Sequence, residues 1–109
     1  TLNRLKLLGL DDLESRIRRL EDIEAIRHLK ARYAEYADEK YTDDHRRKPQ
    51  EELDRIGRLQ AGLFTENAIW DGGEHFGTYR GRDAIFGFVR KGGWSFAMHY
   101  FLNPRIDID

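Results

Sequence analysis

The stretch that decides the fold is LFTENAIWDGGEHFGTYRGRDAI, residues 63–85. Within it, AIWD at 68–71 and HFGTYRG at 75–81 flank the glycine-containing turn GGE. Two short runs with aromatic and β-branched residues around such a turn are typical of a β-hairpin. A short helix is expected next, from RDAIFGFVRKGG at 82–93, ended by its two glycines. Its inward residues would be Ile85, Phe88 and Val89.

Two helices are expected before the hairpin. The first covers residues 11–40, has no glycine or proline, and follows a tail at residues 1–10. An apolar stripe at steps of three and four predicts one buried face; it consists of Leu13, Ile17, Leu20, Ile23, Ile26, Leu29, Tyr33 and Tyr36 or Ala37. After a polar break at 39–50, the second helix starts at Pro49 and runs to about residue 64. Its inward residues would be Leu53, Ile56, Leu59 or Gln60, and Leu63.

The chain closes with WSFAMHYFLNPRIDID, residues 94–109, which reads as a long strand. The expected order is two helices, a hairpin, a short helix and a third strand. Helices and antiparallel strands are then segregated along the chain, which predicts the α+β class.

Composition excludes several classes of function. There are 19 basic and 20 acidic residues, so no global field favours nucleic acid or an anionic membrane. Cysteine is absent, which excludes disulfides and thiol catalysis. No apolar run approaches the ~20 residues of a membrane span, and the start of the chain is too short and charged for a signal peptide. We therefore expect a single cytoplasmic domain.

His99 is the first candidate for chemistry, because strand alternation places it on one face with Ala97 and Phe101. A histidine in a concave apolar face can be a general base if a carboxylate orients it, or simply a buried neutral side chain. Asp38 is the candidate partner, since a carboxylate in the last turn of a helix is poorly placed for the helix dipole. It could equally be a solvated helix-end residue. Tyr33, five residues earlier, lies about 140° around the helix from Asp38 and could be an ordinary stripe residue.

A substrate pocket would draw on aromatic side chains, which could also be plain core. The candidates are Trp70, Phe76, Tyr79, Phe86 and Phe101. The acidic and basic run DDHRR at 43–47 lacks the second histidine at helical spacing that a metal site would need, so no metal is expected.

The chain resembles the SnoaL-like superfamily, the cone-shaped fold of nuclear transport factor 2, scytalone dehydratase and hexachlorocyclohexane dehydrochlorinase. The resemblance rests on IEAIRHLKARYAEYAD, LFTENAIWD, GTYRGRDAI and MHYFLNPRIDI, in this order, and covers about residues 12–109. It implies a long N-terminal helix packed on a curved antiparallel sheet. The superfamily fold continues with further strands after the one at 94–109, so the resemblance implies a truncated domain at 11–109.

The resemblance also implies roles for three residues. In the dehydratase and dehydrochlorinase branches a histidine on this strand pairs with an aspartate near the end of the first helix, and His99 and Asp38 occupy those places. The bile acid 7α-dehydratase branch adds a tyrosine that Tyr33 matches. The implied activity is that of a cofactor-free lyase, dehydratase or isomerase on a hydrophobic ring such as a steroid, polyketide or chlorinated ring.

A module without catalysis is the alternative, either a ligand-binding cone or a scaffold like the β subunit of ring-hydroxylating dioxygenases. A homo-oligomer, dimer or trimer, is expected in either case, with residues 95–103 in the interface because they are apolar on both faces.

Overall fold

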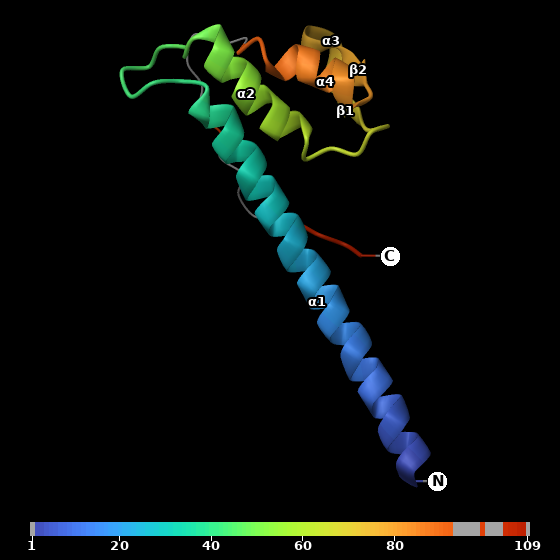
Figure 1. Ribbon diagram of the computed structural model, residues 1–109. Helices are drawn as coiled ribbons and strands as arrows, with labels where there is room; N and C mark the ends of the chain where they lie inside the picture. The colour runs from blue at the N-terminus through green and yellow to red at the C-terminus, as the bar shows by residue number, and fades with distance from the viewer. Residues whose placement is uncertain (1, 93–98, 100–103, 109) are drawn as a thin grey trace.

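The structure is a computed structural model that describes residues 2–92, 99 and 104–108. The described elements are α1 (Leu2–Glu39), α2 (Gln50–Ala61), β1 (Ile69–Asp71), α3 (Gly73–Phe76), β2 (Thr78–Arg80) and α4 (Arg82–Val89). Figure 1 shows α1 as one long rod whose C-terminal end lies against α2, while the remaining elements gather beyond α2 and the N-terminal end projects away from them. The α+β class is confirmed.

Helix α1 begins earlier than the sequence indicated. The expected tail at residues 1–10 is helical from Leu2 onward. Residue 11, where the helix was expected to begin, lies well inside it, because Gly9 disfavours a helix only weakly.

The loop between α1 and α2 is closed at its base by backbone hydrogen bonds. Tyr41 pairs with Arg47 in an isolated β-bridge, and the amide of Lys48 donates to the carbonyl of Lys40 at 2.9 Å. Thr42 N–H donates to the carbonyl of Arg46 at 2.7 Å. The base of this loop therefore fixes the backbone at the end of α1.

The expected hairpin is present, with β1 and β2 antiparallel and Trp70 opposite Tyr79. The connection differs from the expected tight turn, because residues 73–76 form the single-turn helix α3. The third strand was expected at 94–109. Most of that segment lies outside the described residues, and the described residues 104–108 are not in a strand. The sheet that the structure describes accordingly has two strands.

The core lies between α2, α4 and the hairpin. Leu53, Ile56 and Ile85 are essentially inaccessible to solvent, and Ala61 and Val89 pack against Ile85. Leu59, one of two candidates for an inward position on α2, is exposed, whereas the alternative Gln60 is buried. Gly57 permits a close approach of α2 and the end of α4, since a β-carbon there would sit 3.2 Å from the Arg90 α-carbon.

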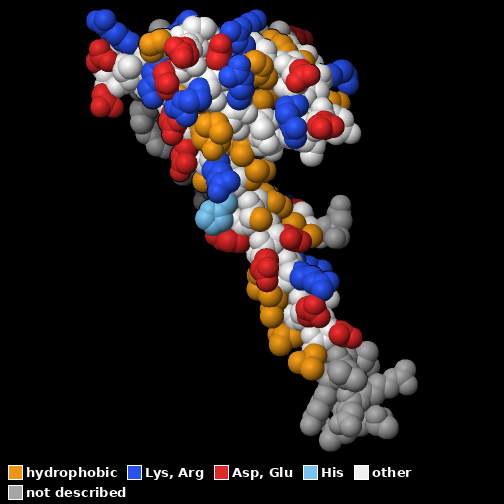
Figure 2. Space-filling model, in the orientation of Figure 1, with side chains coloured by type: hydrophobic (Ala, Val, Ile, Leu, Met, Phe, Trp, Pro, Cys, Tyr) orange, Lys and Arg blue, Asp and Glu red, His pale blue; other side chains and the backbone are white. Residues whose placement is uncertain are grey.

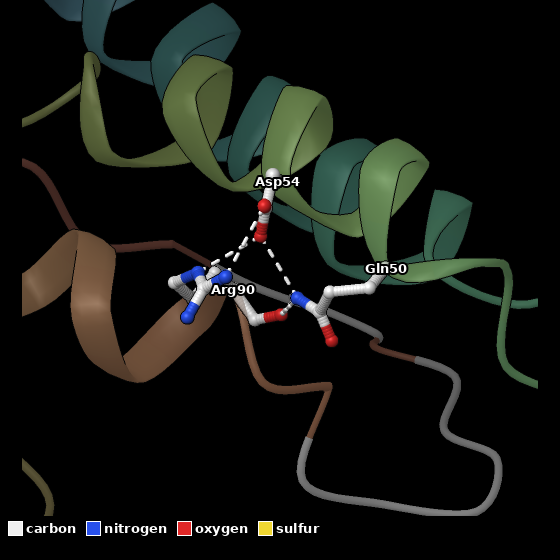
Figure 3. Close-up of polar contacts among 3 residues, drawn as sticks. All are labelled: Gln50, Asp54 and Arg90. Carbon is white, nitrogen blue, oxygen red and sulfur yellow. Dashed lines mark hydrogen bonds and ion pairs between the residues drawn. The ribbon is translucent and has the colours of Figure 1, made fainter.

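Polar contacts fasten the end of α4 to α2 beside this close approach (Figure 3). The Arg90 guanidinium donates to both carboxylate oxygens of Asp54, at 2.8 and 3.1 Å. Gln50 donates to Asp54 Oδ1 at 2.8 Å and to the Arg90 carbonyl at 3.0 Å. This arrangement holds the C-terminal end of α4 against α2.

Candidate functional site

A cavity of about 590 Å³ lies where the C-terminal end of α1 meets α2, α4 and the hairpin. It is lined mainly by apolar side chains together with a few polar ones. The lining residues are Tyr33, Ala37, Lys40, Tyr41, Gln60, Trp70, Gly72, Phe76, Phe88, Val89, Gly92 and His99. A concave, mostly apolar site with a small number of polar groups is the usual form of a small-molecule site.

His99 and Asp38 meet at the edge of this cavity. Asp38 Oδ1 lies 2.8 Å from His99 Nδ1 and also accepts the backbone N–H of His99 at 2.9 Å. Both side chains are about one third exposed. The contact expected from the sequence is therefore present, and one carboxylate oxygen fixes both the ring and the backbone of His99.

Tyr33 lines the cavity from a different side of α1 than Asp38. The indole N–H of Trp70 donates to the Tyr33 hydroxyl at 3.3 Å, which ties the hairpin to α1. Tyr33 and Asp38 do not share a helix face, as their spacing implies, but Tyr33 and Ala37 lie one turn apart on the face that lines the cavity. Asp38, the next residue, projects from the flank of that face and so can reach His99.

The aromatic residues proposed for the pocket divide into three groups. Trp70 and Phe76 line the cavity as expected. Tyr79 and Phe86 do not. Tyr79 stacks on Phe88 with ring centroids 4.5 Å apart, and the guanidinium groups of Arg58 and Arg90 lie 5.6 and 5.9 Å from the centroid of the Phe86 ring. Phe101 lies outside the described residues.

Gly72 is needed for the shape of the cavity wall. A β-carbon at this position would lie 2.3 Å from the Trp70 ring and 2.5 Å from the β-carbon of Phe76. Any side chain there would push the two aromatic residues apart. The first glycine of GGE, Gly72, therefore serves the wall, and the second, Gly73, serves the turn with a positive φ of 73°.

Two polar lining residues were not proposed for the site from the sequence, although Gln60 was an alternative for an inward position of α2. Lys40 is 7% exposed, and burial lowers the pKa of its amine to about 8. Gln60 is 2% exposed. A signal for both exists: Lys40 follows Tyr33 and Ala37 at steps of four and three, and Gln60 follows Leu53 and Ile56 in the same way, so each is a polar residue on an apolar stripe.

Among residues 2–92, 99 and 104–108, no helix is long and apolar enough to cross a membrane. Within the same residues, no three or more His, Asp or Glu side chains are grouped so that they could hold a metal ion.

Residues 57–109 match the family model of the SnoaL-like domain, which confirms the resemblance seen in the sequence. No curated protein and no solved structure matches the chain. The described α+β arrangement, with a long N-terminal helix and an antiparallel hairpin, is consistent with the cone-shaped fold of this superfamily, which includes isomerases, dehydratases and non-catalytic members. The matched segment contains His99 and Gln60, whereas Tyr33, Asp38 and Lys40 precede it.

Proposed function

We propose that the chain is a cofactor-free lyase or isomerase in which His99 removes a proton from carbon. The observation that carries this proposal is the contact of His99 Nδ1 with Asp38 Oδ1 at 2.8 Å, made by a histidine that lines an apolar cavity. A carboxylate at Nδ1 favours the tautomer with its proton on that nitrogen. Nε2 then keeps the lone pair that a general base needs.

The neighbouring side chains fit the same chemistry. Asp38 would stabilise the imidazolium that forms when His99 takes the proton. Tyr33 accepts the indole N–H of Trp70 at 3.3 Å, and a hydroxyl that accepts a hydrogen bond is a stronger donor. Tyr33 would give its proton to a departing oxygen or hydrogen-bond a carbonyl in the transition state.

The cavity supports a hydrophobic ring as the substrate. Its walls are largely aromatic and aliphatic, with Trp70, Phe76 and Phe88 among them, and its volume of about 590 Å³ is in the usual range for small-molecule sites. A purely scaffolding module would fill this space with side chains. The open cavity beside the Asp38–His99 pair is therefore an argument against the scaffold alternative.

The test uses elimination of water from 3-hydroxy-1-tetralone, followed by the fluorescence of the 1-naphthol that forms. His99→Gln and Asp38→Asn should each lower the rate about 10²- to 10⁴-fold, the usual contribution of a positioned general base. His75→Gln is the matched control, because His75 is an exposed residue of α3 that does not line the cavity. If His99→Gln and His75→Gln turn over the ketone equally fast, the proposal is wrong.

We also propose that the chain works as a homo-oligomer. The interface expected at 95–103 lies, apart from His99, outside the described residues. What supports association is an exposed apolar stripe on the projecting part of α1, visible in Figure 2. Its members are Leu10, Leu13, Ile17 and Leu20.

A second copy of this chain is the partner that fits this stripe. The spacing of three, four and three is that of the a and d positions of a two-stranded coiled coil. Arg16 and Glu21 then occupy the flanking g and e positions. Parallel pairing would place Arg16 of one copy beside Glu21 of the other, whereas antiparallel pairing would bring like charges together.

Sedimentation velocity at micromolar concentration tests this pairing. Wild type should sediment as an oligomer, and Leu20→Glu should shift it toward the monomer because a carboxylate would enter the apolar seam. Ser15→Glu adds the same charge on the opposite side of the helix and should change nothing. An unchanged oligomer in Leu20→Glu would exclude the stripe as the interface.

A further inference from the structure

Lys40 places a primary amine in the wall of the cavity. The side chain is 7% exposed, and Lys40 follows Ala37, another lining residue, at a step of three just past the end of α1. The backbone is held at this point, because the Lys40 carbonyl accepts the N–H of Lys48 at 2.9 Å. The proton transfer proposed for His99 makes no use of this amine.

The amine has no counter-ion in the part of the chain that the structure describes. The described lining residues include no Asp or Glu, and the titratable ones besides Lys40 are Tyr33, Tyr41 and His99. The Asp38 carboxylate contacts His99, and no described carboxylate forms an ion pair with Lys40. Burial without a counter-ion disfavours the ammonium, so desolvation lowers the pKa of Lys40 to about 8.

A lowered pKa makes a lysine a nucleophile, because only the neutral amine has a free lone pair. At pH 7 about a tenth of an amine with a pKa of about 8 is neutral, against less than about a thousandth of one at 10.5. Lysines that are desolvated in an apolar pocket are accordingly the ones that form Schiff bases with carbonyl compounds.

The cavity has room and access for a carbonyl compound. Its volume is about 590 Å³, and two of its lining side chains, Phe76 and His99, are partly exposed, so it opens to solvent beside them. Trp70 and Phe88 belong to its apolar wall. Such a wall suits a ligand with an aromatic or aliphatic body, whose carbonyl is then presented to the one lysine among the described lining residues.

We propose that Lys40 binds aldehydes with an apolar ring covalently, as an imine on Nζ. The Nζ lone pair attacks the carbonyl carbon, the π electrons move to the oxygen, and a proton passes from nitrogen to that oxygen through water. The nitrogen lone pair then expels the hydroxyl, which takes a proton from solvent and leaves as water, and the iminium returns one proton to solvent. One amine and one aldehyde give one imine and one water. This binding goes beyond the proposed function and does not depend on it, since His99 takes no part.

The test traps the imine by reduction with sodium cyanoborohydride. The full chain is incubated at pH 7 with 2-naphthaldehyde and the reductant, and peptide mapping by mass spectrometry follows the naphthylmethyl label at each amine. Lys40 should be labelled at least about tenfold faster than any other lysine, because its neutral fraction is larger. It should also be labelled faster than the α-amino group of the protein, which has a similar pKa but no apolar cavity beside it.

A competitor and two variants show whether the cavity is responsible. In wild type, 2-methylnaphthalene has the same ring without a carbonyl, so it should slow the labelling of Lys40 and leave the other amines unaffected. Lys40→Met should lose the fast label. Lys91→Met is the matched control and should keep it, because Lys91 is exposed and does not line the cavity.

Three results would overturn the proposal. The first is labelling of Lys40 no faster than that of the other lysines, and the second is labelling that 2-methylnaphthalene does not slow. The third is tight binding of 2-naphthoate to wild type but not to Lys40→Met, with no label on Lys40 from the aldehyde. In that case Lys40 is an ammonium that pairs with an acid and not a nucleophile.

Discussion

The two ends of α1 carry the same apolar periodicity but lie in different surroundings. At the C-terminal end, Ala37 is 4% exposed and Tyr41, just past the helix, is 7% exposed. Toward the N-terminus, Leu10 and Leu20 are 60% and 65% exposed. Figure 1 shows the reason, since α2 lies only against the C-terminal part. A stripe at steps of three and four thus indicates a helix with an apolar face, but not what covers that face.

The covered end is also the chemically equipped end. Tyr33, Asp38 and Lys40 all lie within its last two turns or just beyond, and each faces the cavity or the histidine that lines it. Burial at this end matters for chemistry, because charges and hydrogen bonds interact more strongly where the local dielectric constant is low.

The largest difference in stability is expected between two leucine truncations. Leu53→Ala, at a fully buried site of α2, should lower the free energy of unfolding by about 2–5 kcal/mol, because it leaves a cavity in the core. Leu20→Ala, on the exposed stripe, should change it by less than about 0.5 kcal/mol in dilute solution. Urea unfolding at submicromolar concentration, where self-association is minimal, measures both.

A comparable loss in the two variants would show that the exposed half of α1 is covered in solution even when dilute. A loss for Leu20→Ala that grows with protein concentration would instead report the pairing of two chains. Either result would show that the exposed half of α1 is covered in solution, so that the two ends differ less in burial than the isolated chain indicates.

Lys40 provides the next largest effect. Because its pKa is about 8 in the folded chain and 10.5 as a free side chain, the unfolded state binds more protons between these values. Stability should therefore rise as the pH increases through this window, and the burial penalty should be fully present below about pH 8. Lys40→Met should be more stable than wild type at pH 7 by about 3 kcal/mol.

The advantage of Lys40→Met should shrink toward pH 10.5. Thermal unfolding of both proteins from pH 7 to 10.5 measures this difference, in which the titration of the tyrosines cancels. Lys91→Met is the control, because Lys91 is exposed and does not line the cavity, and it should track wild type. A constant difference between Lys40→Met and wild type at all pH values would mean that the Lys40 amine is well solvated.

Local patterns were sufficient for much of the fold. The stripe of α1, the strand runs around Gly72 and the inward residues Ile85 and Val89 all follow from neighbouring residues. The start of α1 could not be placed from neighbouring residues, because helix boundaries depend on weak end signals. An acidic residue such as Asp11 can lie inside a helix as well as at its start. The single-turn helix α3 was not predicted, because four residues are too few to show the hydrophobic periodicity of a helix.

The site was predictable in part. The contact between His99 and Asp38 was suggested by the unfavourable position of Asp38 at the helix end and was strengthened by the resemblance, because two residues so far apart in sequence have no shared local signal. Tyr79 and Phe86 show the limit of composition: an aromatic side chain can face a cavity or the layer behind it, and alternation alone does not say which. Lys40 could have been proposed for the site, and so could Gln60, which was considered only as an inward residue of α2, since each interrupts an apolar stripe.

The smallest expected effect compares two ion pairs of similar length. Asp54 and Arg90 join α2 to the end of α4 through two hydrogen bonds, and both side chains are partly buried (Figure 3). Glu14 and Arg18 form a 2.6 Å pair within the exposed half of α1, where both side chains are well exposed. Hydrogen bonds from Arg90 hold the pKa of Asp54 below its usual range. The stability that the Asp54–Arg90 pair adds is thus fully present above the ordinary pKa of an aspartate. It is lost as the pH falls below that value and through the lowered pKa of Asp54.

At pH 7, Asp54→Asn should lower the melting temperature slightly, and by less than Leu53→Ala does. The melting temperature of Asp54→Asn should also fall less than that of wild type when the pH is lowered to 3. Glu14→Gln should leave the melting temperature unchanged, because an exposed pair within one helix is screened by solvent and adds no contact between elements. Melting curves at pH 7 and pH 3, at low and high salt, measure both variants. If both variants lose the same melting temperature, and the loss depends on salt, the effect comes from the overall charge of the protein and not from the contact between α2 and α4. A loss confined to Asp54→Asn, and resistant to salt, would indicate that the contact between α2 and α4 is what the pair stabilises.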